Sequence, residues 1–251
     1  MLDFSTLHEH TRPAVIAHRG VSNLHRENTI PAFQAAIEAG CDGIELDVRR
    51  TRDGVLVVHH NVIVKGTHRR LSTTRYSVLK DAARMAGYDI STLEEVLALG
   101  TGKIALDIEL KEEGCEAAVV ELVKQYYDLR NIVFTSFRDR VIRSVKEIEL
   151  QARTGLILGL MNPSAFRARL RSGTLTRRLR RARADIVVPH RALITRTFCR
   201  RIEKSRLPII AWTVNNAKTA RRLSNRSVGA IITDVPQKIA PVLRMPFSEQ
   251  G

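Results

Sequence analysis

Two short segments of the chain carry acidic residues at alternate positions of an apolar run. The first reads Gly-Ile-Glu-Leu-Asp-Val and puts Glu45 and Asp47 on one face of a strand, opposite its apolar side chains. The second reads Ala-Leu-Asp-Ile-Glu-Leu and puts Asp107 and Glu109 on one face in the same way. In a barrel the apolar face packs against outer helices, so we expect the carboxylates to point inward, near the carboxyl ends of their strands.

Carboxylates clustered in this way need positive charge among them. Buried side by side, they repel one another unless a cation or a proton lies between them. A site made only of oxygen ligands suits a hard divalent cation such as Mg²⁺ or Ca²⁺. A buried ion-pair network with Lys111 and Arg49 is the alternative that these two segments leave open.

Two histidines end extended segments that would meet the same rim. His18 follows the apolar residues 14–17 and precedes Arg19, and His60 ends the extended segment after the first acidic strand. A histidine can take a proton from one oxygen and give one to another near neutral pH. Cleavage of a phosphodiester needs both transfers, and it needs positive charge that a metal ion, Arg19 and Lys111 would supply. A lone histidine at a strand end is more often structural, whereas two beside a carboxylate cluster indicate catalysis.

Strands and helices are expected to alternate along the chain. The expected strands lie at residues 14–17, 43–48, 104–110, 132–135, 154–158, 185–188, 208–214 and 230–233, with segments of helical period between them. Eight strands, each followed by a helix, are the pattern of a (β/α)₈ TIM barrel, and a doubly wound open sheet is the alternative. Residues 55–60 read as an extra extended segment, and about 61–90 as a short insertion after strand two. We expect a single domain over residues 1–251.

Charge and cysteine content narrow the class of protein. The 251 residues carry a net charge of +15, and residues 167–183 hold eight Arg and no acid. This basic stretch is either a solvated helical face or a surface for an anionic membrane. Three widely spaced cysteines form no metal-binding pattern, no apolar run is long enough to span a bilayer, and the N-terminus has no secretory pattern. We therefore expect a cytoplasmic protein, which would be peripheral at the membrane if the basic stretch docks there.

The motifs, taken in order, resemble the glycerophosphodiester phosphodiesterase family. They lie at residues 18–20 (His-Arg-Gly), 27–29 (Glu-Asn-Thr), 40–48, 51–54, 60, 92–97, 107–111, 136–137, 212–215 and 231–236. Each piece is weakly specific by itself, but their order and spacing across residues 15–236 are highly specific. Residues 61–90 and 160–184 resemble the family only weakly.

The resemblance implies an activity and a set of roles. It implies a phosphatidylinositol-phospholipase-like barrel that hydrolyses glycerophosphodiesters to glycerol 3-phosphate and an alcohol, with lysophospholipids or sugar phosphodiesters as alternative substrates. The implied metal ligands are Glu45, Asp47 and Glu109, and the implied acid–base pair is His18 and His60. Arg19 and Lys111 would hold phosphoryl oxygens, and Trp212 would line the pocket for the alcohol portion unless it is only a core aromatic.

The chain departs from the family pattern at three positions. Asn61 follows the second histidine where the family usually has Asp, which keeps an acceptor oxygen and loses the charge. Arg26 and Ser91 replace two prolines, and neither change removes a catalytic group. Glu27 is expected to brace Arg19 or the metal site, or to be purely structural. These departures leave the reaction class intact and the preferred substrate open.

Two other functions remain to be weighed. A barrel that binds an anionic phosphate or lipid without turnover would be expected to lack a metal ligand or a catalytic histidine. Here the three implied metal ligands and both implied catalytic histidines are present. Binding of nucleic acid would rest on charge alone, because the chain is only 5% aromatic and carries no recognised nucleic-acid motif. We therefore expect a small-molecule or lipid-derived phosphodiester as the partner, and not nucleic acid.

Overall fold

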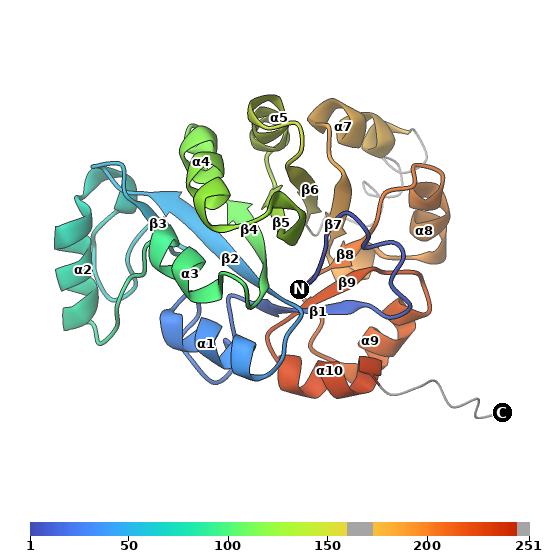
Figure 1. Ribbon diagram of the computed structural model, residues 1–251, viewed down its shortest axis with the longest axis horizontal. Helices are drawn as coiled ribbons and strands as arrows, with labels where there is room; N and C mark the ends of the chain where they lie inside the picture. The colour runs from blue at the N-terminus through green and yellow to red at the C-terminus, as the bar shows by residue number, and fades with distance from the viewer. Residues whose placement is uncertain (160–172, 245–251) are drawn as a thin grey trace.

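The computed structural model describes residues 1–159 and 173–244 as a parallel β-barrel surrounded by helices (Figure 1). The barrel strands are β1 (Ala14–His18), β2 (Gly43–Arg50), β4 (Ala105–Leu110), β5 (Ile132–Ser136), β6 (Arg153–Leu158), β7 (Ile186–Pro189), β8 (Ile210–Ala211) and β9 (Ala230–Thr233). Hydrogen bonds join them in the order β7-β6-β5-β4-β2-β1-β9-β8. Parallel bridges from Val187 to Ile209 and from His190 to Trp212 join β7 to the segment of β8, so the ring closes. The predicted (β/α)₈ barrel is confirmed.

The helices that follow the strands form the outer wall. They are α1 (Ile30–Glu38), α3 (Leu93–Gly100), α4 (Glu116–Tyr126), α5 (Asp139–Ile148), α7 (Thr174–Ala182), α8 (Arg196–Glu203), α9 (Ala217–Ser224) and α10 (Pro236–Arg244). Short 3₁₀ helices η2 (Leu129–Asn131) and η3 (Arg191–Leu193) belong to the connections. Among the described helices, none is long and apolar enough to cross a membrane. Of the basic stretch at 167–183, residues 167–172 lie outside the described part of the chain, and the remainder consists of α7 and its two cap residues.

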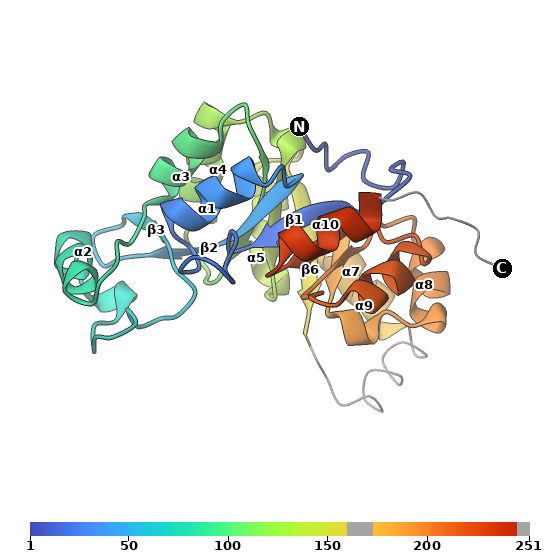
Figure 2. The same cartoon turned by 90° about the horizontal axis from the view of Figure 1, so that it is seen from below.

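The predicted insertion after the second barrel strand forms a lobe at one end of the molecule (Figures 1 and 2). β3 (Leu56–Val58) pairs antiparallel with the end of β2, and η1 (Leu71–Thr73) and α2 (Tyr76–Met85) follow it. Helix α2 was not predicted, because only Leu79 and Ala83 on it are fully buried and the rest of its sequence is polar or exposed. These two residues pack with Val57, Val64, Leu71 and Ile90 in a small core of the lobe.

Strand alternation divides the barrel into an apolar layer and a functional layer. Inward side chains nearer the amino ends of the strands, including Ile16, Val133, Ile186 and Ile210, are fully buried together. Phe4 and Leu7 of the N-terminal segment belong to the same cluster, so they close this end of the barrel. The next inward positions, nearer the carboxyl ends, are therefore the ones that face an accessible pocket.

Candidate active site

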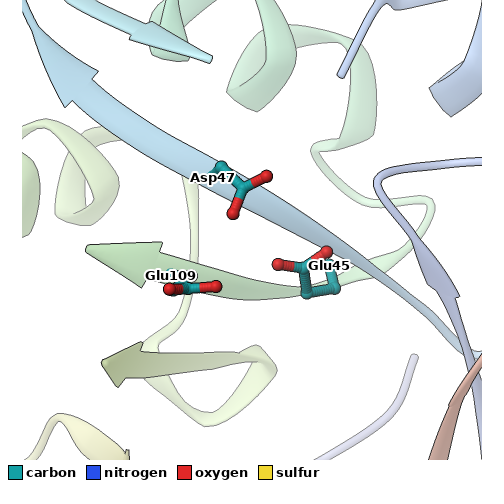
Figure 3. A group of neighbouring side chains, drawn as sticks. All are labelled: Glu45, Asp47 and Glu109. Atoms are coloured by element: carbon teal, nitrogen blue, oxygen red, sulfur yellow. The ribbon is translucent and has the colours of Figure 1, made fainter. Parts of the chain in front are cut away.

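Three carboxylates from β2 and β4 meet at the carboxyl end of the barrel. The two strands pair with Glu45 opposite Asp107 and Asp47 opposite Glu109, so the register brings the inward acids side by side. One oxygen each of Glu45, Asp47 and Glu109 lies within 4.8 Å of the others, and all three residues are buried (Figure 3). The alternation read from the sequence thus places these three acids together.

Two cations and an amide hold the central carboxylate. Lys111 Nζ lies 3.0 Å from Asp47 Oδ1 and 2.8 Å from Glu109 Oε1, and Arg19 Nε lies 3.0 Å from Asp47 Oδ2. The side-chain amide of Asn28 donates to Asp47 Oδ2 (2.8 Å), and its carbonyl accepts from the backbone N–H of Asp47 (3.2 Å). Asn28 was not predicted as a site residue, although it stands inside the Glu-Asn-Thr motif.

Within the cluster, the surroundings of Asp47 favour its ionised form, whereas those of Glu45 favour its protonated form. Burial alone would raise the pKa of Asp47, but the hydrogen bond from His60 and the charges of Lys111 and Arg19 hold it well below its usual range. Burial, with repulsion from Asp47 and Glu109, raises the pKa of Glu45 well above its usual range. Burial also raises the pKa of Glu109, against the favourable charge of Lys111.

A divalent cation fits this set of donors. Without one, burial and mutual repulsion favour a proton on Glu45, and Asp47 Oδ1 is buried without a hydrogen bond of good geometry among the described residues. Three carboxylate oxygens are hard ligands, and a doubly charged ion would balance the charge that Lys111 and Arg19 leave uncompensated. Glu45, Asp47 and Glu109 are therefore the residues that could hold a metal ion.

The loop after β1 gives the cluster its amide and guanidinium donors. Arg19 and Asn28 both have positive φ (55° and 59°), which is uncommon for residues other than glycine. This backbone lets the N–H of Arg19 donate to Glu45 Oε2 (3.1 Å) while its side chain reaches Asp47. Glu27 accepts from Arg19 Nη1 (2.8 Å), so of the two sites predicted for Glu27 it braces the arginine.

Each of the two histidines is held by a carboxylate at Nδ1. The Nδ1–H of His18 donates to Asp234 Oδ1 (2.6 Å), and that of His60 donates to Asp47 Oδ2 (3.2 Å). Because an ionised carboxylate can only accept, both rings carry a proton on Nδ1. The opposite nitrogen, Nε2, is left for chemistry, and in His18 it lies 3.8 Å from Glu45 Oε2. Sequence analysis predicted both histidines but not the carboxylate partner of His18.

Asp234 is the site residue that sequence reasoning missed. Burial opposes its ionisation, but hydrogen bonds from His18, Asn215 and Ser22 hold its pKa below the usual range. It follows β9, which pairs with β1, so the barrel brings it beside His18 across more than two hundred residues of sequence. The signal that could have found it is its position directly after the last strand, because first and last strands are neighbours in a closed barrel.

The pocket at this rim holds about 270 Å³ and has two unlike walls. Its charged wall includes both histidines, Arg19, Lys111 and the acids Glu45, Asp107 and Glu109. Its other wall is apolar and consists of Phe137, Ile157, Val188, Trp212 and Ile232. Trp212 stands at right angles to the ring of Phe137, and its indole N–H donates to the carbonyl of Val188 (3.0 Å). Trp212 thus lines the pocket and has a fixed orientation.

Two of the three positions that depart from the family pattern, Arg26 and Asn61, line a second hollow of about 250 Å³, which shares His60 with the pocket. The side chain of Asn61 is exposed there, and its backbone carbonyl accepts from His59 Nδ1 (2.8 Å). His60 lines the pocket, whereas its neighbour His59 does not. Arg26 stacks on the ring of Tyr88, 3.3 Å from its centroid, and so joins the loop after β1 to the insertion.

Comparison with known proteins decides the family. Residues 18–238 match the model of the glycerophosphoryl diester phosphodiesterase family. The chain belongs to this family. It is 30% identical over 248 residues to a glycerophosphodiester phosphodiesterase of Caldanaerobacter subterraneus, with 92% of this chain and 97% of the relative covered. It is 34% identical over 244 residues to the Bacillus subtilis protein YhdW, with 90% of this chain and 96% of that protein covered.

Solved structures of family members share the whole barrel. The glycerophosphodiester phosphodiesterase of Thermotoga maritima superposes with a TM-score of 0.78 at 26% identity, covering 93% of this chain and 99% of that one. A phosphodiesterase of Oleispira antarctica, solved with the product sn-glycerol 3-phosphate, gives a TM-score of 0.80 at 24% identity, covering 93% of this chain and 98% of that one. Membership of this family makes the chain a phosphoric diester hydrolase.

Proposed function

We propose that the protein hydrolyses glycerophosphodiesters to glycerol 3-phosphate and an alcohol, using a divalent cation, Mg²⁺ or Ca²⁺, on Glu45, Asp47 and Glu109. One observation carries the proposal: three carboxylates that could hold a metal ion are buried together beside a pocket. Two of them, Glu45 and Glu109, line this pocket together with two histidines, each held by a carboxylate at Nδ1. A bound cation would supply charge to the phosphoryl group and lower the energy of the transition state.

The two histidines divide the proton transfers. One takes the proton of the glycerol hydroxyl next to the phosphodiester, and the freed oxygen attacks phosphorus. The other donates a proton to the oxygen of the departing alcohol as its bond to phosphorus breaks. Water then opens the resulting cyclic phosphate with the two roles reversed, which yields glycerol 3-phosphate and restores both histidines.

Fixed charges and the apolar wall orient the substrate. Arg19 and Lys111 line the pocket with their cationic groups among the carboxylates, so they are placed to hold phosphoryl oxygens. Trp212 and Phe137 cover the carbon skeleton of the glycerol and exclude water from that side. The hollow beside His60, lined also by Asn61, Lys65 and Tyr88, is open to a polar alcohol group. The absence of a charge on Asn61 is expected to affect the choice of alcohol more than the rate of cleavage.

A substrate panel tests the proposal. We expect glycerol 3-phosphate to be released from glycerophosphocholine or glycerophosphoethanolamine with Mg²⁺ or Ca²⁺ and not after chelation. A lysophospholipid with a free hydroxyl at carbon 2 and a sugar phosphodiester complete the panel and separate the alternative substrates. The matched control is a glycerophosphodiester whose neighbouring hydroxyl is methylated, which the proposed attack cannot cleave. Turnover of the methylated compound at the same rate, or turnover unaffected by chelation, would refute the mechanism.

A further inference from the structure

Positive charge is divided very unevenly between the two described parts of the chain. Residues 1–159 hold 21 Lys and Arg against 22 Asp and Glu, so they are close to neutral. Residues 173–244 hold 17 Lys and Arg against three acids. Nearly all of the net charge of +15 therefore belongs to the part of the barrel that carries α7, α8, α9 and α10.

Part of this charge gathers around a hollow of about 480 Å³ between α7 and α8. The face of α7 contributes Gly173, Thr176 and Arg180, and the face of α8 contributes Thr197, Arg200, Arg201, Lys204 and Ser205. Both sets follow the three- and four-residue spacing of one helical face. We call this hollow the cationic groove. Its described lining has four cations and three hydroxyl groups and no carboxylate.

Three of the four cations of the groove, Arg180, Arg200 and Lys204, form no ion pair within the described residues. Arg178, on another face of α7, forms a bidentate pair with Asp139 of α5, as a structural arginine does. Within residues 1–159 and 173–244, by contrast, no ion pair joins Arg180, Arg200 or Lys204 to a carboxylate, and all three are exposed. Arg200, in the last turn of α8, and Lys204, the C-cap residue of that helix, stand four positions apart, so their like charges repel each other. An external anion would relieve this repulsion.

We propose that the cationic groove docks the protein on a membrane surface that contains anionic phospholipids. Guanidinium groups and hydroxyls together are donors suited to the phosphate of a lipid headgroup, which one hollow of this size accommodates. Exposed cations outside the groove on α7, Arg177 and Arg181, would add attraction to the charged membrane surface. Among the described residues that line the groove none is aromatic, so they do not form the stacking platform typical of sites for single-stranded nucleic acid.

The groove is separate from the active site. Its helices lie at the end of the long axis opposite the insertion with α2, as both views show (Figures 1 and 2). None of its residues lines the pocket of the histidines and carboxylates. Changes in the groove are therefore expected to alter docking without altering cleavage of a soluble substrate.

Cosedimentation with vesicles of phosphatidylcholine, with or without phosphatidylglycerol, tests this proposal. The groove variant is Arg180→Glu/Arg200→Glu/Lys204→Glu, and the matched control is Lys218→Glu/Arg221→Glu/Arg222→Glu on α9, with the same change in charge. We expect the wild type to bind only vesicles with anionic lipid, and less at high salt. The groove variant should lose about tenfold or more in apparent affinity, since each basic residue near the surface contributes roughly 1 kcal/mol. The control should lose less than about threefold.

Several results would overturn the proposal. Equal binding to neutral vesicles would exclude anionic headgroups, and equal losses in both triple variants would show diffuse attraction without a groove. Duplex DNA that binds the groove more tightly than vesicles at equal phosphate concentration would assign the surface to nucleic acid. Thermal unfolding and activity on a soluble phosphodiester check that each variant is folded. If the charge reversals prevent folding, Arg180→Gln/Lys204→Gln makes the same test, with about half the expected loss.

Discussion

The two sides of the barrel use the same structural position for opposite chemistry. Inward residues near the carboxyl ends of β1, β2 and β4 are His18, Glu45, Asp47, Asp107 and Glu109, whereas those of β6, β7, β8 and β9 are Ile157, Val188, Trp212 and Ile232. The first side can hold a metal ion and a phosphoryl group, and the second can cover carbon atoms. A phosphodiester of glycerol needs both walls, so the division of the pocket matches the two parts of the proposed substrate.

The comparison also shows where the protein gives up stability for function. Three acids of the charged wall, Glu45, Asp107 and Glu109, lie within one small region, where burial and mutual repulsion raise the pKa of each. On the apolar wall, Ile157, Val188 and Ile232 belong to the buried cluster that fills the barrel, and Trp212 packs against it, so no buried charge opposes folding there. If this division is correct, substitutions on the charged wall should change turnover most, those on the apolar wall should change substrate affinity, and some on the charged wall should stabilise the protein.

The largest effect is expected for the histidines. His18→Ala and His60→Ala should each lower kcat by roughly 10²–10⁴-fold, the usual contribution of a general acid or base. His59→Ala is the matched control, because His59 lies next to His60 but does not line the pocket. Steady-state kinetics with glycerophosphocholine make the comparison. If either catalytic variant keeps turnover within about threefold of the wild type, that histidine has no role in proton transfer.

A smaller loss is expected for the residue that positions His18. Asp234→Asn should lower kcat by roughly 10–100-fold with little change in KM, because it disturbs the protonated Nδ1 and the ring orientation of His18. Asp234→Glu should recover part of the loss, since a carboxylate is restored. Ser22→Ala, which removes only a longer hydrogen bond to Asp234 (3.3 Å), is the control and should stay near wild-type activity. A KM effect without a kcat effect would contradict the positioning role.

The apolar wall should act mainly on affinity. Trp212→Ala should raise KM by about tenfold while lowering kcat less, because it removes contact with the substrate in both the ground and transition states. Trp212→Phe keeps an aromatic surface but loses the hydrogen bond to the carbonyl of Val188, and it should have an intermediate KM. Steady-state kinetics give both kcat and KM for each variant. A loss of kcat without a rise in KM would contradict the assignment of substrate affinity to the apolar wall.

The smallest effect is a gain of stability on the charged wall. Burial raises the pKa of Asp107 to about 7, against the hydrogen bond from Thr135, with repulsion from Glu109 and Asp47 adding to it. Because the folded pKa exceeds the unfolded value of about 3.9, this residue costs stability increasingly as pH rises from about 4 to 7 and a constant amount above. The free energy of unfolding of Asp107→Asn should therefore exceed that of the wild type by roughly 1–3 kcal/mol at pH 8 and should show no gain at pH 3.5.

Urea unfolding of the metal-free protein at both pH values measures this difference. Thr135→Val is a useful companion, because it removes the hydroxyl that donates to Asp107 Oδ1 (2.6 Å) and should destabilise at either pH. An Asp107→Asn variant less stable than the wild type at pH 8 would show that the acid is not under electrostatic strain.

The sequence was sufficient to predict whatever depends on local periodicity. Strand alternation alone places Glu45 and Asp47 on one face, and the expected strand at 43–48 agrees with β2 (Gly43–Arg50). The capping box of α3, formed by Thr92 and Glu95, is likewise a local feature of the sequence. Periodicity was not sufficient for α2, because that helix buries only two residues against a small lobe.

Contacts between distant segments could not be predicted in this way. The partnership of Asp234 with His18 depends on closure of the barrel, and that of Asn28 with Asp47 depends on positive φ at two positions of the loop after β1. Neither feature has a local signature. The single-domain organisation and the roles assigned to the site residues stay predictions that the variants above can test.

The most direct test of the central claim is calorimetric titration of Mg²⁺ or Ca²⁺ into chelator-treated protein. We expect one ion to bind to the wild type and to His18→Ala. In Glu45→Gln/Glu109→Gln binding should be abolished, because glutamine keeps the size and shape of each side chain but removes its charge. His18 serves as the contrast, because it belongs to the pocket but not to the three carboxylates. Equal binding by the wild type and the double variant would contradict the account, since the metal would then lie elsewhere.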